Sequence, residues 1–248
     1  MGLVQEWYRG VELVYGSNED DSLVGAVAAT TVYGGSGNDT IRMRNNHDSL
    51  VFGGAGNDYI KYELYYGYGS DSASISGGTG DDVIDVSADM HGFLISGDDG
   101  NDFILGSNYF HQSGPDTIFG GTGNDSIDGF GGDDQLFGGD GDDDLWGDNG
   151  HDSIWGGTGN DSICGHDDND VLVGEAGNDT IWGGYGDDSL AGDAGDAADL
   201  DASLQGADFL YGDYGNDHIW GCAGNDSLGG GKGADWIYGG AGLKRNLE

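Results

Sequence analysis

The sequence Gly120-Gly121-Thr122-Gly123-Asn124-Asp125-Ser126-Ile127 recurs almost unchanged as Gly156-Gly157-Thr158-Gly159-Asn160-Asp161-Ser162-Ile163. Both stretches follow the nonapeptide Gly-Gly-x-Gly-x-Asp-x-U-x, in which U is an aliphatic residue. Its Asp returns in one unbroken series and, after a gap, in a second: Asp116, Asp125, Asp134, Asp143, Asp152, Asp161, Asp170, Asp179 and Asp188, then Asp208, Asp217, Asp226 and Asp235. Such periodicity indicates a repeat architecture.

The chemistry of the nonapeptide predicts its conformation. The Gly-rich part can take positive φ and turn tightly, which residues with a Cβ resist. The remaining Asp-x-U-x supplies a short strand with one aliphatic side chain pointing inward. Two nonapeptides make one turn, so each strand pairs with the strand two repeats away. We therefore predict an all-β fold, a parallel β-roll (β-solenoid) with two repeats per turn.

The composition limits the function. The 248 residues include 54 Gly, and 46 acidic residues face only 7 basic ones, for a formal net charge of −39. This charge excludes nucleic acid as an ordinary partner, because phosphate binding needs a basic face. No apolar run is long enough for a transmembrane segment. The regular aliphatic positions argue against a disordered acidic tail, so the acids are expected to bind a cation.

Calcium is the cation that this pattern favours. Each loop stacks its Asp carboxylate and its exposed carbonyls on the next loop, and Ca²⁺ takes six to eight such oxygens at ~2.3–2.6 Å. Mg²⁺ demands a smaller octahedron and keeps its waters. The predicted carboxylate ligands are Asp39, Asp58, Asp116, Asp125, Asp134, Asp143, Asp152, Asp161, Asp170, Asp179, Asp188, Asp208, Asp217, Asp226 and Asp235. The predicted carbonyl ligands are those of Gly34, Gly35, Gly120, Gly121, Gly138, Gly139, Gly156, Gly157, Gly183 and Gly184.

The metal is also expected to drive folding. Burial of one aliphatic side chain yields ~1.5–3 kcal/mol, whereas ordering each of nine residues costs ~1 kcal/mol or more. Hydrophobic burial alone therefore does not close a turn, and the metal-free chain is expected to be largely disordered.

These motifs, with Gly34-Gly35-Ser36-Gly37-Asn38-Asp39-Thr40-Ile41 among them, resemble the hemolysin-type calcium-binding repeats of RTX (repeats-in-toxin) proteins over roughly residues 16–242. The resemblance implies a right-handed roll with ions held between loops two repeats apart, as for Asp116 with Asp134 and Asp170 with Asp188. It also implies type I export, folding in external calcium, and on the order of ten ions.

Departures from the repeat suggest the organisation of the chain. We expect an N-terminal cap over residues 1–15, a degenerate roll over 16–119, a regular calcium-binding roll over 120–242 with an insertion near 192–205, and a tail over 243–248 with residues left by cloning. Loop 16–21 and segment 25–33 are expected to close the end of the roll. Asp168 stands where Gly is usual, which puts its loop in doubt. Cys164 and Cys222 lie too far apart in the roll for a disulfide and are expected to be free.

Three insertions fall after the repeats of Asp58, Asp82 and Asp102, so they should stack along one edge of the roll. These insertions, within residues 62–115, hold three candidate catalytic residues: His91, His111 and Tyr109. They are open to three interpretations: tolerated surface loops, a ligand patch, or a catalytic site. The chain has neither the zinc-protease motif His-Glu-x-x-His nor the lipase motif Gly-x-Ser-x-Gly.

The sequence thus favours an extracellular, secreted calcium-binding module that stabilises or assists export of a larger protein, with a fused or associated domain as its partner. One alternative is an enzyme that acts on a small molecule or polysaccharide through the inserted loops. Another is an adhesive or surface-layer spacer.

Overall fold

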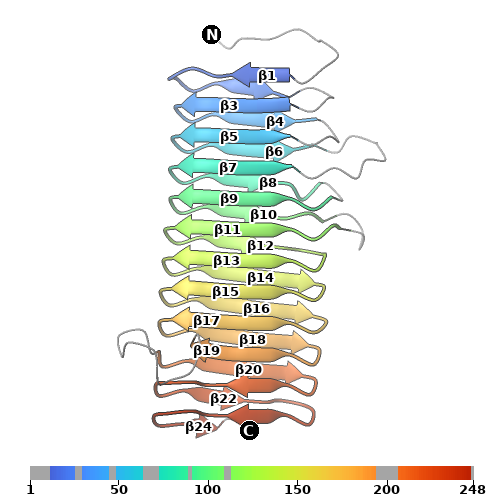
Figure 1. Ribbon diagram of the computed structural model, residues 1–248, viewed down its shortest axis with the longest axis vertical. Coiled ribbons are helices and arrows are strands. Elements are labelled where there is room, and N and C mark those ends of the chain that lie inside the picture. Colours follow the sequence, from blue (N-terminus) through green and yellow to red (C-terminus); the bar gives the residue numbers. More distant parts are fainter. Residues whose placement is uncertain are drawn as a thin grey trace. The chain divides into compact units, whose positions relative to one another are not determined.

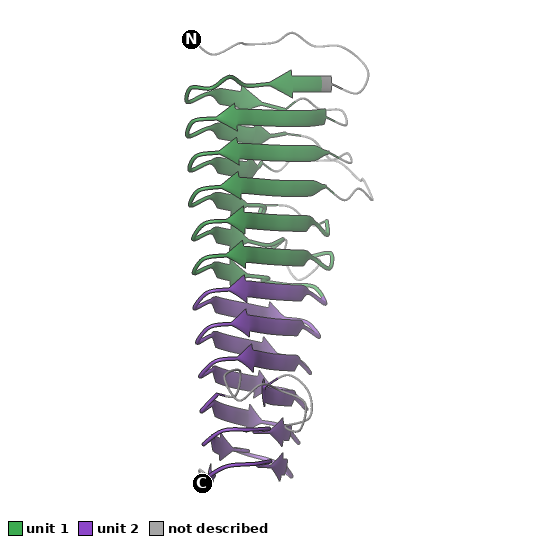
Figure 2. Ribbon diagram, turned by 60° about the vertical axis from the view of Figure 1, so that its left-hand side comes forward, with its two compact units in different colours: residues 1–132 green, residues 133–248 purple. Residues whose placement is uncertain are grey.

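The computed structural model describes residues 12–25, 30–44, 49–63, 73–88, 91–108, 113–193 and 206–246. The regular elements in these ranges are all β-strands (Figure 1). The chain forms two compact units, unit 1 over residues 1–132 and unit 2 over residues 133–248, shown in different colours in Figure 2. No helix in the described part of the chain is long and apolar enough to span a membrane.

Unit 1 contains two parallel sheets that alternate along the chain. Its odd sheet is made of β1 (Glu12–Tyr15), β3 (Thr30–Ser36), β5 (Leu50–Ala55), β7 (Ser74–Thr79), β9 (Leu94–Asp99) and β11 (Thr117–Thr122). Its even sheet is made of β2 (Ser22–Val24), β4 (Thr40–Met43), β6 (Tyr59–Tyr62), β8 (Val83–Asp85), β10 (Phe103–Leu105) and β12 (Ser126–Asp128). Each strand pairs in parallel with the strand two places along the chain, which confirms the predicted parallel solenoid with two repeats per turn.

Unit 2 repeats this arrangement. Its odd sheet is made of β13 (Gln135–Asp140), β15 (Ser153–Thr158), β17 (Val171–Ala176), β19 (Ser189–Asp193), β21 (His218–Trp220) and β23 (Trp236–Tyr238). Its even sheet is made of β14 (Asp144–Asn149), β16 (Ser162–Asp167), β18 (Thr180–Tyr185), β20 (Phe209–Tyr214), β22 (Ser227–Gly229) and β24 (Arg245–Asn246).

The core of each unit lies between its two sheets. The aliphatic of each repeat points inward and its neighbours point outward, because side chains alternate along a strand. In unit 2, Ile154 pairs with Leu172 and Ile163 pairs with Ile181. The inward residues with no exposed surface include, in unit 1, Ile41, Ile60, Ile84, Ile104 and Ile127, and, in unit 2, Leu136, Leu145, Ile154, Ile163, Leu172, Ile181, Leu190 and Leu210.

The loops depend on positive φ at two positions of the repeat. In the loop after β15, Gly157 has φ +116° and Gly159 has φ +134°. Asp168 occupies the second of these positions with φ +78°, and its loop forms nonetheless, with Asp167 of β16 in register with Tyr185 of β18. The doubt raised by Asp168 was therefore wrong, because an Asp side chain tolerates the left-handed region better than most. Both described cysteines are free, and Cys222 takes φ +58° at a usual Gly position.

The degenerate beginning of the chain forms regular turns. β1 pairs with β3, so the first turn begins inside the segment predicted as a cap. β2 lies directly after loop 16–21, and β3 covers most of the described part of segment 25–33, where both stack as ordinary rungs. Backbone pairing and the inward Leu23 and Val32 build these rungs. That the two segments close the end of the roll stays a prediction. The predicted domain boundaries remain predictions.

The insertions lie where the repeat spacing predicted. β6, β8 and β10 are successive neighbours in the even sheet of unit 1, and the chain departs from the repeat after each of them. The insertion near 192–205 comes in the sequence after β19, which is a strand of the odd sheet of unit 2. Most of the inserted residues lie outside the described ranges.

Candidate metal centre

The loop between β15 and β16 shows the repeating unit of the site. Asp161 ends this loop, immediately before β16, and is 2% exposed. Its Oδ1 accepts a hydrogen bond of 2.9 Å from the backbone N–H of Asp143, one turn earlier. Its own N–H donates to Oδ1 of Asp179, one turn later, also at 2.9 Å. Each Asp is therefore oriented by its neighbours in the row above and below.

The same bond runs through both units. In unit 1 it joins the N–H of one Asp to Oδ1 of the next at 2.7–2.8 Å, through Asp21, Asp39, Asp58, Asp82, Asp102 and Asp125. In unit 2 it runs at 2.8–3.2 Å through Asp134, Asp152, Asp170, Asp188, Asp217 and Asp235 in one row, and through Asp143, Asp161, Asp179, Asp208 and Asp226 in the other. One oxygen of every carboxylate that follows the first in its row is thus hydrogen-bonded to the backbone.

The second oxygen of these carboxylates lies buried with no hydrogen-bond donor. This holds for Oδ2 of Asp39, Asp58, Asp82 and Asp102 in unit 1, and of Asp152, Asp161, Asp170, Asp179, Asp188, Asp208 and Asp217 in unit 2. A buried anionic oxygen without a hydrogen-bond donor or a counter-charge costs free energy. A cation bound at these atoms would remove that cost.

Each of these oxygens points at a space that only glycine leaves clear. A Cβ added to Gly156 would overlap Asp161 Oδ2 and would lie 2.6 Å from the carbonyl oxygen of Gly174 in the next turn. At Gly165 the overlap is with Asp170 Oδ2, and the next-turn carbonyl lies 2.7 Å away. A carboxylate oxygen and a carbonyl oxygen from two layers therefore converge beside the first Gly of the nonapeptide.

This donor set fits calcium. Carboxylate and carbonyl oxygens are hard ligands, and Ca²⁺ accepts a mixed set of them at ~2.3–2.6 Å. Within the described ranges no three His, Cys, Asp or Glu side chains gather to hold a metal. Backbone carbonyls such as that of Gly174, which lies beside the same space as Asp161 Oδ2, offer further oxygens.

The raised pKa values of the buried Asp side chains also favour a cation beside them. Burial raises the pKa of Asp152 and Asp179 to about 7, against 3.8 for an ordinary Asp, although the backbone hydrogen bond to each carboxylate opposes the shift. Burial likewise raises the pKa of Asp170 and Asp208 to about 8. A nearby cation favours the charged form of a carboxylate, so an ion bound between the loops would reverse these shifts.

Unit 1 has two different edges. We call the loops that lead into even strands the even edge, and those that lead into odd strands the odd edge. The even edge carries the Asp row described above. We call the Asp that each loop contributes to such a row the ladder Asp. On the odd edge, the strand register puts other residues at this position: Thr30, Ser49, Ala73 and Phe93. The last turn of unit 1 has an Asp there, Asp116.

The position of the first Gly changes on the odd edge as well. There the chain has Met43, Tyr62 and Val86, directly after the outward residue of β4, β6 and β8, and all three are at most 2% exposed. The ring of Tyr62 meets that of Phe93 edge to face, with centroids 5.1 Å apart. Apolar side chains thus fill the space that an ion would take, and three rungs of this edge are held by hydrophobic contact.

These results refine the predicted ligands. The predicted ligands Asp39 and Asp58 lie in the even row. Asp82 and Asp102 belong to the same row and were not among the predicted ligands. The stretch Gly77-Gly78-Thr79-Gly80-Asp81-Asp82 carries the motif and was sufficient to include Asp82. Asp116 differs from the others, because its Oδ2 accepts a hydrogen bond of 2.7 Å from the N–H of Ser107.

Of the three candidate catalytic residues, one lies in the described part of the structure. His91 lies between β8 and β9 and is half-buried. His111 and Tyr109 lie outside the described residues, so a catalytic site at the insertions remains a prediction.

Buried Asp rows, glycine-cleared spaces and parallel two-sheet turns together define a cation-binding β-solenoid. The RTX calcium-binding nonapeptide repeat (4 copies) matches residues 9–41, 46–61, 68–89, 94–108, 112–145, 137–172, 164–196, 204–235 and 223–242. The chain therefore belongs to the family of RTX calcium-binding repeats. No curated protein matches it.

Proposed function

We propose that this chain is a calcium-binding β-roll of a secreted protein that folds on binding Ca²⁺ outside the cell and serves as a stabilising or secretion-assisting module. The observation that carries the proposal is the row of buried Asp Oδ2 atoms with no hydrogen-bond donor. Because RTX repeats are typical of secreted proteins, the same residues would remain uncompensated in a low-calcium interior and gain their ions outside.

The ions are assigned to spaces between successive loops of one edge. In unit 2 both edges qualify, and Asp161 Oδ2 with the Gly174 carbonyl is the pattern for each site. In unit 1 the even edge qualifies, from Asp39 through Asp102. The proposed ligands are the predicted Gly carbonyls and the predicted Asp carboxylates, with Asp82 and Asp102 added and without Asp116 and Asp226, whose Oδ2 atoms already have a donor. They supply places for on the order of ten ions.

Coupling of calcium to folding follows from the charge of the rows. In the metal-free roll, successive carboxylates lie one strand spacing apart, about 4.8 Å, and repel one another as well as resisting burial. Each Ca²⁺ removes both penalties and links two loops. Ions that bind the folded state and not the unfolded chain stabilise it by mass action.

A calcium titration followed by far-ultraviolet circular dichroism tests the proposal. We expect a disordered spectrum in excess chelator at neutral pH and a cooperative change to a β spectrum in millimolar Ca²⁺. Mg²⁺ at the same concentration is the control and should not produce this change, because it keeps its waters. A complete β spectrum in chelator at neutral pH would contradict ion-driven folding.

The export role needs a separate experiment in a type I secretion host that carries this chain fused to a reporter. Variants with Asn in place of several ladder Asp residues of unit 2 should reach the medium in smaller amounts, or unfolded, when external calcium is millimolar. Equal secretion and equal protease resistance of the variant and the parent would argue against an export-assisting module.

A further inference from the structure

The last turn of unit 2 has a lysine at the position of the ladder Asp. β24 pairs with β22 so that Arg245 faces Ser227, which follows Asp226. Lys244 therefore stands in the even row directly after Asp226, where every earlier rung of unit 2 has another Asp.

The Lys244 ammonium lies against the same two kinds of oxygen as a proposed calcium ion. Its Nζ donates to Asp226 Oδ2 and, at 3.2 Å, to the carbonyl oxygen of Gly224. The Asp226 side chain is fully buried and that of Lys244 is 16% exposed. Its aliphatic stem packs on Gly239, where an added Cβ would lie 2.8 Å from Lys244 Cγ.

Two preceding Asp residues of unit 2, Asp208 and Asp217, lack such a donor. Oδ2 of Asp208, the previous residue of the same row, is buried without a partner, as is Oδ2 of Asp217 in the other row. Asp226 is thus a ladder carboxylate of unit 2 whose second oxygen already has a positive charge beside it. An ammonium and a Ca²⁺ ion cannot share this space, because both would need Oδ2 of Asp226 as a ligand and like charges repel.

We propose that Lys244 replaces calcium beside Asp226 in the even row of unit 2, as a built-in cation at the position of an ion. This inference rests on the proposed function, since it assumes that the earlier rungs bind Ca²⁺. The ammonium gives the buried carboxylate of Asp226 a counter-charge in place of a bound ion.

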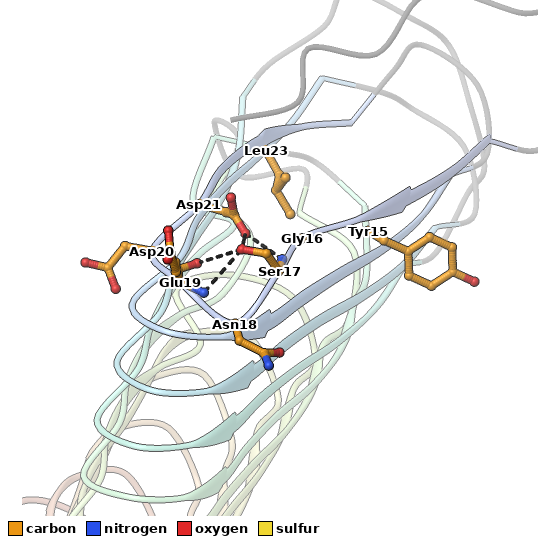
Figure 3. A pocket seen from close by; sticks show the side chains of 8 residues that line it. All are labelled: Tyr15, Gly16, Ser17, Asn18, Glu19, Asp20, Asp21 and Leu23. Carbon is orange, nitrogen blue, oxygen red and sulfur yellow. Dashed lines mark hydrogen bonds between the residues drawn. The ribbon is translucent and has the colours of Figure 1, made fainter. Parts of the chain in front are cut away.

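In the first ladder Asp of unit 1, Asp21, neutral hydrogen-bond donors of the chain take the place that the Lys244 ammonium has beside Asp226. Asp21 Oδ2 accepts hydrogen bonds from Ser17 N–H at 2.6 Å and from Ser17 Oγ at 2.8 Å, inside the loop that lines the pocket in Figure 3. The next ladder residue, Asp39, has no donor at Oδ2. The chain's own groups therefore satisfy the carboxylate of Asp21 too.

Equilibrium dialysis with radioactive calcium tests the role of Lys244. The variant Lys244→Met keeps the aliphatic stem and removes the ammonium, so it should bind one more Ca²⁺ per chain than the parent at saturation. Lys232→Met is the matched control: Lys232 is exposed, its Nζ contacts Tyr214 Oη at 3.0 Å, and its loss changes the charge equally. The control should leave the count unchanged.

Equal counts in the parent and in Lys244→Met would overturn the inference while leaving the proposed function intact. If neither protein binds calcium, the proposed function itself fails. If the Lys244→Met variant does not fold, a second measurement on the parent protein tests the inference. In the calcium-loaded parent, amine acetylation read by mass spectrometry should modify Lys244 at least tenfold more slowly than Lys232, and equal rates would also overturn the inference.

Discussion

Replacing Asp161 by Asn should change stability in opposite directions with and without calcium. The amide keeps an oxygen that can accept the bond from the Asp143 N–H but puts a neutral group where the buried Oδ2 now lies. With calcium present the variant loses at least one ion between its loops. At 10 mM Ca²⁺ and a dissociation constant of ~10⁻⁴–10⁻³ M, that ion is worth about 1–3 kcal/mol of unfolding free energy.

Without calcium, the Asp161→Asn variant should no longer be less stable than the parent. Burial raises the pKa of Asp161 to about 6 from 3.8, which corresponds to at most ~3 kcal/mol of destabilisation by the ionised carboxylate at neutral pH. Asn removes this penalty. The metal-free variant should therefore be as stable as the metal-free parent or more stable.

Urea unfolding followed by circular dichroism measures both arms. The calcium-free arm contains chelator, and both arms contain the same concentration of trimethylamine oxide, which strengthens the compact state. Asp144→Asn is the matched control, because Asp144 is an exposed residue of β14 and its replacement changes the charge equally. A loss of stability in both arms, or no loss in calcium, would refute the assignment of Asp161 as an ion ligand.

Three further changes have expected outcomes. Gly156→Ala should lower the calcium stoichiometry in equilibrium dialysis, because its Cβ would overlap Asp161 Oδ2; the outward Ser153→Ala is its control, and an unchanged count would contradict the cleared space. Tyr62→Ala should cost ~3–5 kcal/mol in urea unfolding of the calcium-loaded protein, as for other buried aromatics, with no change in ion count; a lost ion would place a site on the odd edge of unit 1. The pKa of Asp170 is raised to about 8, so its contribution to the stability of the metal-free roll is full below pH 3.8 and is lost as the pH rises through 8. In chelator, circular dichroism should accordingly show more β structure at pH 4.5 than at pH 8.5, and the opposite order would contradict this.

The sequence predicted the strands and most of the Asp residues of the rows, although not Asp82 and Asp102, because one short unit specifies both the strand and its Asp. In Gly156–Ile163 the glycines give the turn, the aliphatic gives the inward face, and the Asp lies where the strand begins. The strand register then follows from repetition, since each strand can pair only with the copy one turn away. This local rule also held at Asp168, where the backbone tolerated an unusual residue.

The apolar odd edge of unit 1 could not be predicted in the same way. The register puts Ser49 and Ala73 at the position of the ladder Asp, and neither residue belongs to a recognisable nonapeptide. The spacing of Asp residues identifies turns that carry the motif, but it does not identify the residues that replace the motif in other turns. Met43 and Tyr62 carry no motif, and only their place in the turn shows that they fill the space of an ion.

The Asp-to-Asp hydrogen bond has a consequence for how such chains can change over time. In regular turns it joins residues 18 apart, yet the same bond spans 19, 20, 23 and 24 residues in unit 1 and 29 residues in unit 2. The bond fixes neighbouring rungs whatever length of chain lies between them. The solenoid is therefore a host into which new segments can be inserted, by evolution or by design, without disturbing the rungs on either side.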